Sequence, residues 1–141
     1  MVIDTSAILA VLLNEAEAEF FAQAIASDPR RLVSAVSILE AGIVVRTRKG
    51  PSGGQALDQL IESAGLTIAD FDAEQARLAR VAYEQFGKRQ HPAALNLGDC
   101  CSYALARHTG EPLLFKGEDF PKTDIPQWKP KPPDTGEGAT G

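Results

Sequence analysis

The sequence predicts an α/β domain with a short, mostly parallel central sheet of about four to five strands flanked by helices. Short apolar segments rich in Val, Ile and Leu alternate with longer segments of helical periodicity. Parallel strands need such intervening helices, whereas antiparallel strands can be joined by tight turns. Acidic residues follow several of the predicted strands, where open α/β sheets bind their ligands.

Length and composition indicate one domain. The chain has 141 residues, 44% of them hydrophobic, which is enough for a sizeable core. Its net charge of -5 argues against a protein that coats nucleic acid, although it allows an enzyme that acts locally on RNA. No segment approaches the ~20 apolar residues of a membrane span. An acid at Asp4 is also unlike the start of a secretory signal, so we expect a cytoplasmic protein with no membrane contact.

The two cysteines, Cys100 and Cys101, are adjacent. Neighbours on a helix point roughly 100° apart, which argues against both a disulfide between them and a metal-binding pair. We expect both side chains to pack in the core.

Asp4 follows the first predicted strand, residues 2–3, and precedes a helix predicted for residues 7–13. Asp4, Thr5 and Ser6 are all residue types that cap helices. Asp4 also lies at the carboxyl end of a buried strand, which is a ligand position in this fold class. Both interpretations stay open from position alone.

Glu40 lies within an apolar helical segment. A helix is predicted for residues 16–27, a strand for 31–34, and a further helix from residue 36, capped by Ser34 or Ser37. Around Glu40, the neighbours Val36 and Ile43 leave little room for a solvent-exposed stripe. We therefore expect a functional role for Glu40.

The middle of the chain supplies scaffold and basic residues. Residues 51–54 are predicted to break the chain, followed by a helix at 55–64, a strand at 66–69 and a helix at 72–86 capped by Asp72. A short basic loop at 87–93 follows, in which His91 has no assigned role. Five residues of this part of the chain are candidate contacts for a nucleic-acid backbone: Arg46, Arg48, Lys49, Lys88 and Arg89.

Asp99 begins an otherwise small and apolar helical segment at residues 96–106. A strand is predicted for 111–115, a loop with Glu118 and Asp119 for 116–120, and an edge strand for 123–125. We assign residues 1–126 to the folded domain. Residues 127–141 are rich in Pro and Gly, and are predicted to be a disordered tail without function.

Four acids are predicted to converge. Right-handed crossovers would bring Asp4, Asp99 and Asp119 to one edge of the sheet, with Glu40 entering from its helix. Crowded carboxylates repel one another unless a cation offsets their charge, and hard oxygen ligands favour Mg²⁺ or Mn²⁺. Such a site suits phosphodiester hydrolysis. Asp4 and Asp99 would bind the metal directly or through water. Glu40 would orient or deprotonate the attacking water, and Asp119 would complete the coordination or support a second ion, although these last two roles could be exchanged.

The acidic segments carry a family resemblance. Residues 1–7, 37–40, 95–106 and 113–120 resemble, in order and spacing, the acidic motifs of PIN-domain ribonucleases. More narrowly, they resemble the VapC toxins of bacterial VapBC toxin–antitoxin modules. The resemblance spans about residues 1–126.

This resemblance implies a PIN-like fold and a Mg²⁺- or Mn²⁺-dependent endoribonuclease that cuts a cellular RNA of the tRNA or rRNA class. It implies neutralisation by a cognate VapB antitoxin, contact with DNA only indirectly through that antitoxin, and a homodimer. Asp4, Glu40 and Asp99 match the family's acids, while the fourth is either Asp119 or Glu118. Thr5 and Ser6 match its hydroxyl pair, and helix capping explains them equally well.

Two alternatives belong to other functional classes. One is a catalytically inactive PIN-like module that acts only by binding protein. The other is a phosphoryl-transfer domain of receiver or haloacid-dehalogenase type. It is disfavoured because Ser6 stands where dehalogenase chemistry needs a second acid, and no acid pair marks the first strand.

Overall fold

The structure is a computed structural model that describes residues 1–133. It contains a four-stranded sheet and helices, in the α/β class that the sequence predicts. In chain order the elements are β1 (Val2–Ile3), α1 (Thr5–Leu12), α2 (Ala18–Ser27), β2 (Leu32–Ser34), α3 (Ala35–Lys49), α4 (Pro51–Ser63), β3 (Thr67–Ala69), α5 (Ala73–Phe86), α6 (Leu97–Thr109), β4 (Leu113–Leu114) and a 3₁₀ turn, η1 (Phe120–Lys122).

The sheet is parallel throughout, in the order β3-β2-β1-β4. Val2 of β1 pairs with Leu32 on one side and with Leu113 on the other. Because all strands run the same way, the residues that follow β1, β2 and β4 emerge at one edge. That edge carries Asp4 and the loop after β4.

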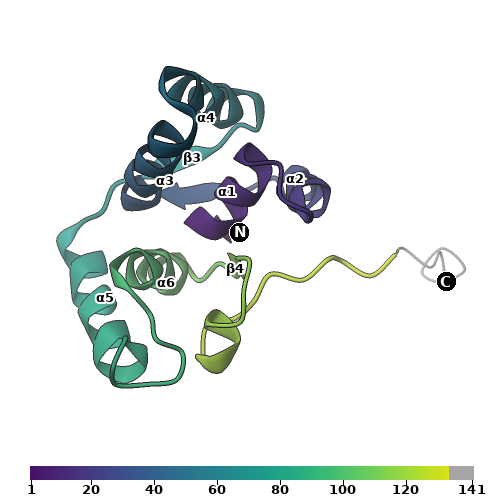
Figure 1. Ribbon diagram of the computed structural model, residues 1–141. Coiled ribbons are helices and arrows are strands. Elements are labelled where there is room, and N and C mark those ends of the chain that lie inside the picture. Colours follow the sequence, from purple (N-terminus) through teal and green to yellow (C-terminus); the bar gives the residue numbers. More distant parts are fainter. Residues whose placement is uncertain (134–141) are drawn as a thin grey trace, which may run out of the picture.

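Helices cover both faces of the sheet (Figure 1). Successive strand side chains point to opposite faces: Ile3, Val33 and Leu114 join a core with α1, α2, α3 and α4, whereas Val2 and Leu113 join a core with α5 and α6. Helix α3 also contacts α6, across the edge that carries the acids. No helix within residues 1–133 is both long enough and apolar enough to cross a membrane.

The predicted break at residues 51–54 is wrong, because these residues form the first turn of α4. Gly50, with a φ of 65°, ends α3, and Pro51 then occupies the first turn of the next helix, where its missing N–H costs no hydrogen bond. Gly53 is buried against α3: a Cβ there would lie 2.7 Å from the carbonyl carbon of Val45. Its glycine thus permits close packing rather than a turn.

The end of the described chain also differs from expectation. Residues 123–125 do not form a strand; the extended pairing falls at Gln127, which bridges to Leu113. The Trp128 N–H donates to the Leu113 carbonyl oxygen (2.9 Å), and the indole packs against the α1–α4 core and edge-on to Phe20. Packing onto the domain therefore continues past residue 126. Residues 134–141 of the predicted tail lie outside the described residues.

Candidate active site

Asp4 is a buried acid with one unpartnered oxygen. Its side chain is 3% exposed and caps α1, because Oδ2 accepts hydrogen bonds from the Ser6 N–H (3.0 Å) and the Ser6 hydroxyl (2.6 Å). Oδ1 is buried and has no hydrogen-bond partner among residues 1–133. A buried polar atom is nearly always paired, so this oxygen is available to a ligand. The capping and strand-end interpretations of Asp4 are thus compatible.

Ser6 links Asp4 to the loop after β4. While its hydroxyl donates to Asp4, its Oγ accepts the backbone N–H of Lys116 (2.9 Å). Lys116 begins the loop that carries Glu118 and Asp119. Sequence reasoning recognised a hydroxyl at this position but not this link, since nothing local to residues 4–6 signals a partner so far along the chain.

Asp99 lies in the first turn of α6 and shares a capping box with Asn96. The Asp99 N–H donates to the Asn96 side-chain oxygen (2.9 Å), and the Asn96 N–H donates back to Asp99 Oδ2 (3.1 Å). Burial raises the pKa of Asp99 to about 7; the Asn96 N–H opposes this shift, while the negative charges of Asp4, Asp119 and Glu40 add to it. The structure therefore brings the other three predicted acids within electrostatic reach of Asp99.

Glu40 approaches this helix turn from α3. Its half-buried carboxylate lies against Gly98: a Cβ on Gly98 would be 2.6 Å from Oε1 and 2.8 Å from the carboxyl carbon. Glu40 therefore contacts α6, although the expected lack of a solvent-exposed stripe around it is wrong, because Leu39 and Ile43 on the same helix are exposed. Sequence reasoning missed Gly98, although a glycine directly before an acid in an apolar helix was a usable signal.

The fourth position is an exposed loop residue. Asp119 precedes η1 and makes no side-chain capping bond. Its charge contributes to the raised pKa of Asp99, whereas Glu118, also exposed, is absent from the charges that do so. This difference favours Asp119 over Glu118.

The four acids lack basic partners. No Lys, Arg or His side chain within residues 1–133 forms an ion pair with Asp4, Glu40, Asp99 or Asp119. Over the same residues, no three His, Cys, Asp or Glu side chains are close enough to hold a metal ion as they stand. The donor set nevertheless fits a hard divalent cation, because all four side chains offer oxygens and Asp4 Oδ1 has no other partner.

Neighbouring groups do not add to this donor set. Cys100 and Cys101 are free and buried, as predicted, and burial raises the pKa of their thiols to about 12 and about 11, so neither is a thiolate ligand. His91 Nδ1 accepts the Ala93 N–H (3.0 Å). The five basic residues predicted to contact nucleic acid are all exposed.

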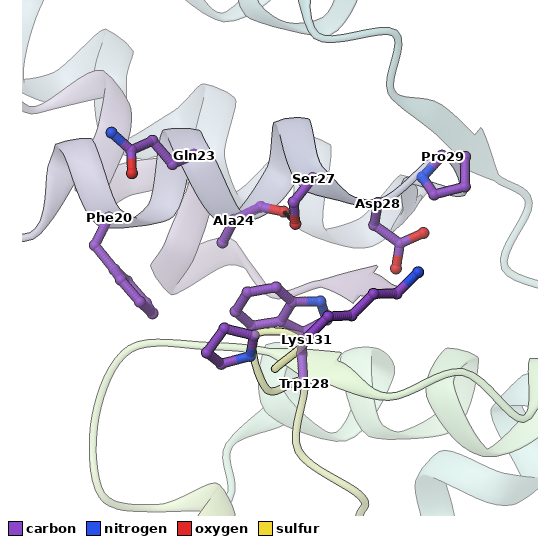
Figure 2. Close-up of a pocket in the computed structure, with 9 residues that line it drawn as sticks. Phe20, Gln23, Ala24, Ser27, Asp28, Pro29, Trp128 and Lys131 are labelled. Atoms are coloured by element: carbon purple, nitrogen blue, oxygen red, sulfur yellow. Dashed lines mark hydrogen bonds between the residues drawn. The ribbon is translucent and has the colours of Figure 1, made fainter. Parts of the chain in front are cut away.

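Two surface hollows lie apart from the four acids. One, of about 530 Å³, is formed where Trp128 and Lys131 cross α2; Figure 2 shows the indole beneath α2 and the Lys131 amine directed toward Asp28. The other, of about 550 Å³, lies between α3, α5 and α6; its lining is mostly apolar, including Leu97 and Cys100, but also contains Arg80 and Glu84. Neither is lined by a predicted site residue.

The fold and the acidic edge define a known class of protein. The PIN domain family matches residues 1–126, so this chain belongs to the PIN domain family. Within that family it is 50% identical, over 125 residues, to Ribonuclease VapC of Mycolicibacterium smegmatis; the match covers 89% of this chain and 97% of that protein. Its relatives are thus the VapC ribonucleases.

Solved structures share the fold. The crystal structure of Mycobacterium tuberculosis VapC20, described as a Sarcin-Ricin loop cleaving toxin, superposes with a TM-score of 0.74 at 19% identity, covering 92% of this chain and 98% of that one. VapBC2 from Rickettsia felis, bound to a DNA fragment from its promoter, gives 0.69 at 16% identity, covering 89% and 94%. At these identities the likeness concerns the fold alone.

Proposed function

We propose that this chain is the endoribonuclease toxin of a type II toxin–antitoxin pair and hydrolyses RNA with Mg²⁺ or Mn²⁺. The observation that carries the proposal is the convergence of acids at one edge of the sheet: Asp4 Oδ1 is buried without a partner, the Glu40 carboxylate lies against Gly98 next to Asp99, and none of the four acids has a basic partner within residues 1–133. The raised pKa of Asp99 agrees with this arrangement. Such a group of like charges becomes favourable when a divalent cation binds it. The 50% identity to a VapC ribonuclease supports the same activity.

Each acid has a distinct role in this proposal. Asp4 and Asp99 hold the cation, Asp4 through its unpartnered Oδ1. Glu40 orients the attacking water or takes its proton, and Asp119 completes the site from its loop. When bound, the cation lowers the pKa of water and offsets the charge on the phosphate. Ser6 and Asn96 keep Asp4 and Asp99 in place through their hydrogen bonds.

The partners follow from the same assignment. The substrate is a cellular RNA of the tRNA or rRNA class, which implies action in the cytoplasm. A VapB-type antitoxin neutralises the enzyme, a proposal that the VapBC2 complex supports at the level of fold. We also propose a homodimer that meets DNA only through the antitoxin.

The test is RNA cleavage by purified protein. Cleavage should need Mg²⁺ or Mn²⁺, stop with EDTA, and fall about 10³-fold in Asp99→Asn, because loss of a cation's charge raises a barrier by several kcal/mol. The matched control is Asp58→Asn, which neutralises an exposed acid on α4 and should leave cleavage unchanged.

Two outcomes would contradict the proposal. Cleavage that persists unchanged in Asp99→Asn would remove this acid from the site. No cleavage by the wild type, together with tight binding of a protein partner, would instead favour the inactive PIN-like binding module.

A further inference from the structure

Gly98 occupies a position where glycine has no conformational advantage. It is buried in the first turn of α6, and its φ is not in the left-handed region that favours glycine. Within a helix, glycine is less favourable than alanine because it loses more backbone entropy on folding. Some other property of Gly98 must therefore account for this residue.

The property that matters is the absence of a side chain, which leaves room beside the backbone of Gly98. A Cβ built on Gly98 would meet both carboxylate oxygens and the carboxyl carbon of Glu40, with separations of 2.6 Å to Oε1 and 2.8 Å to Cδ. Real Cβ atoms do not approach other heavy atoms so closely. Glu40 would have to move, and its carboxylate is the part of the side chain that the site uses.

We propose that Gly98 is a positioning residue, whose missing side chain leaves the space in which the Glu40 carboxylate lies beside Asp99. This inference rests on the proposed nuclease function of the same four acids. Gly98 touches neither substrate nor cation, and acts only by setting where Glu40 can be. The first turn of α6 also presents free backbone N–H groups, next to which a carboxylate is favourable.

The first test is cleavage by Gly98→Ala. Displacing a catalytic group by about 1 Å can cost on the order of 10²-fold in rate, and a loss of this size is expected in kcat rather than KM. Gly54→Ala is the matched control: Gly54 is also helical, nothing lies within 4 Å of its added Cβ, and cleavage should be unchanged.

Rescue distinguishes positioning from damage to the fold. Glu40→Asp shortens the side chain by one methylene group. It should lower cleavage in the wild-type background but raise it in the Gly98→Ala background, where it relieves the clash. If Gly98→Ala cleaves as well as the wild type, or if Glu40→Asp lowers cleavage equally in both backgrounds, the proposal is overturned.

A thermal unfolding cycle tests the same contact without RNA or metal. With EDTA present, Gly98→Ala should raise the Tm of Glu40→Ala by about 2–4 °C through helix propensity, and should raise the Tm of the wild type less or lower it, because there the Glu40 carboxylate must also be displaced. Equal shifts in both backgrounds would overturn the proposal. If the cycle holds while the wild type does not cleave RNA, the nuclease function fails and the spatial relation of Gly98 to Glu40 stands.

Discussion

Acidic residues of this protein occur in two contrasting settings. On the turn between α1 and α2, Glu15 and Glu17 both form ion pairs with Lys116. Elsewhere on the surface, Glu111 forms an ion pair with Arg30 (2.9 Å). At the carboxyl edge of the sheet, the four site acids have no such partner among the described residues. Lys116 lies only three residues before Asp119, yet its amine is engaged with the α1–α2 turn.

This difference indicates what the edge of the sheet is built to bind. Pairing within the protein satisfies the first group of acids, so they need nothing from solution. The site acids have no such pairing within residues 1–133: burial, together with the negative charges of Asp4, Asp119 and Glu40, raises the pKa of Asp99. A cluster of acids left without internal cations requires protons or an external cation to offset its charge.

After Asp99→Asn, the largest effect on cleavage among variants that test this contrast is expected from Ser6→Ala. Ser6 donates to Asp4 Oδ2 and accepts from the Lys116 N–H, so its loss should loosen both Asp4, the acid proposed to bind the cation, and the loop that carries Asp119. Loss of such a supporting hydrogen bond typically costs 10–100-fold, and we expect a fall of about this size in cleavage rate.

The control for Ser6→Ala is Ser52→Ala. Ser52 is an exposed helical serine whose hydroxyl donates to the Lys49 carbonyl oxygen (3.0 Å), and its removal should leave cleavage unchanged. Full activity of Ser6→Ala would mean that the hydroxyl is not needed to hold these groups.

A smaller effect is expected in the pH dependence of stability. The pKa of Asp99 rises from 3.8 to about 7 on folding, so the folded state holds this proton more tightly. Metal-free protein should therefore lose stability as pH rises from about 4 to about 7, and Asp99→Asn should remove that part of the slope. Denaturant unfolding in EDTA across this range measures the difference between the two proteins.

Metal should reverse the trend. Because a cation binds deprotonated carboxylates, added Mg²⁺ should stabilise the wild type more at pH 7.5 than at pH 5. Identical slopes for the wild type and Asp99→Asn would contradict the assignment of the shifted pKa to this residue.

The smallest effect is expected from the paired acids. Glu17→Gln removes one exposed partner of Lys116, and exposed ion pairs contribute little because water screens them. The Tm should fall by no more than about 2 °C. In the same metal-free assay at pH 7.5, Asp99→Asn should raise the Tm. A shift of the same sign in both variants would remove the contrast between the two settings.

Much of the fold could be predicted because it depends on local patterns. The four strands coincide with short apolar segments that the sequence shows directly. The helix caps at Ser34 and Asp72 could be predicted from residue type. Prediction failed where one residue type serves two purposes. The glycines of α4 were interpreted as a break, whereas Gly53 serves close packing on Val45.

The chain beyond residue 126 could not be predicted from composition. Its Pro-rich segment has few apolar residues, but Trp128 is one of them, and its contacts with Phe20 and the Leu113 backbone depend on where β4 places the chain. Composition describes the average behaviour of a segment, whereas docking depends on a single large side chain.

The sequence by itself determined the fold class and the acids worth examining, because period, capping residues and acids after strands are local signals. Tertiary structure alone decided that the charge of Asp119 contributes to the raised pKa of Asp99, that the Ser6 hydroxyl accepts the N–H of Lys116 in the loop after β4, and that the Glu40 carboxylate lies against Gly98. These relations join residues far apart in the chain. They depend on distances of a few ångströms that helix and strand packing sets.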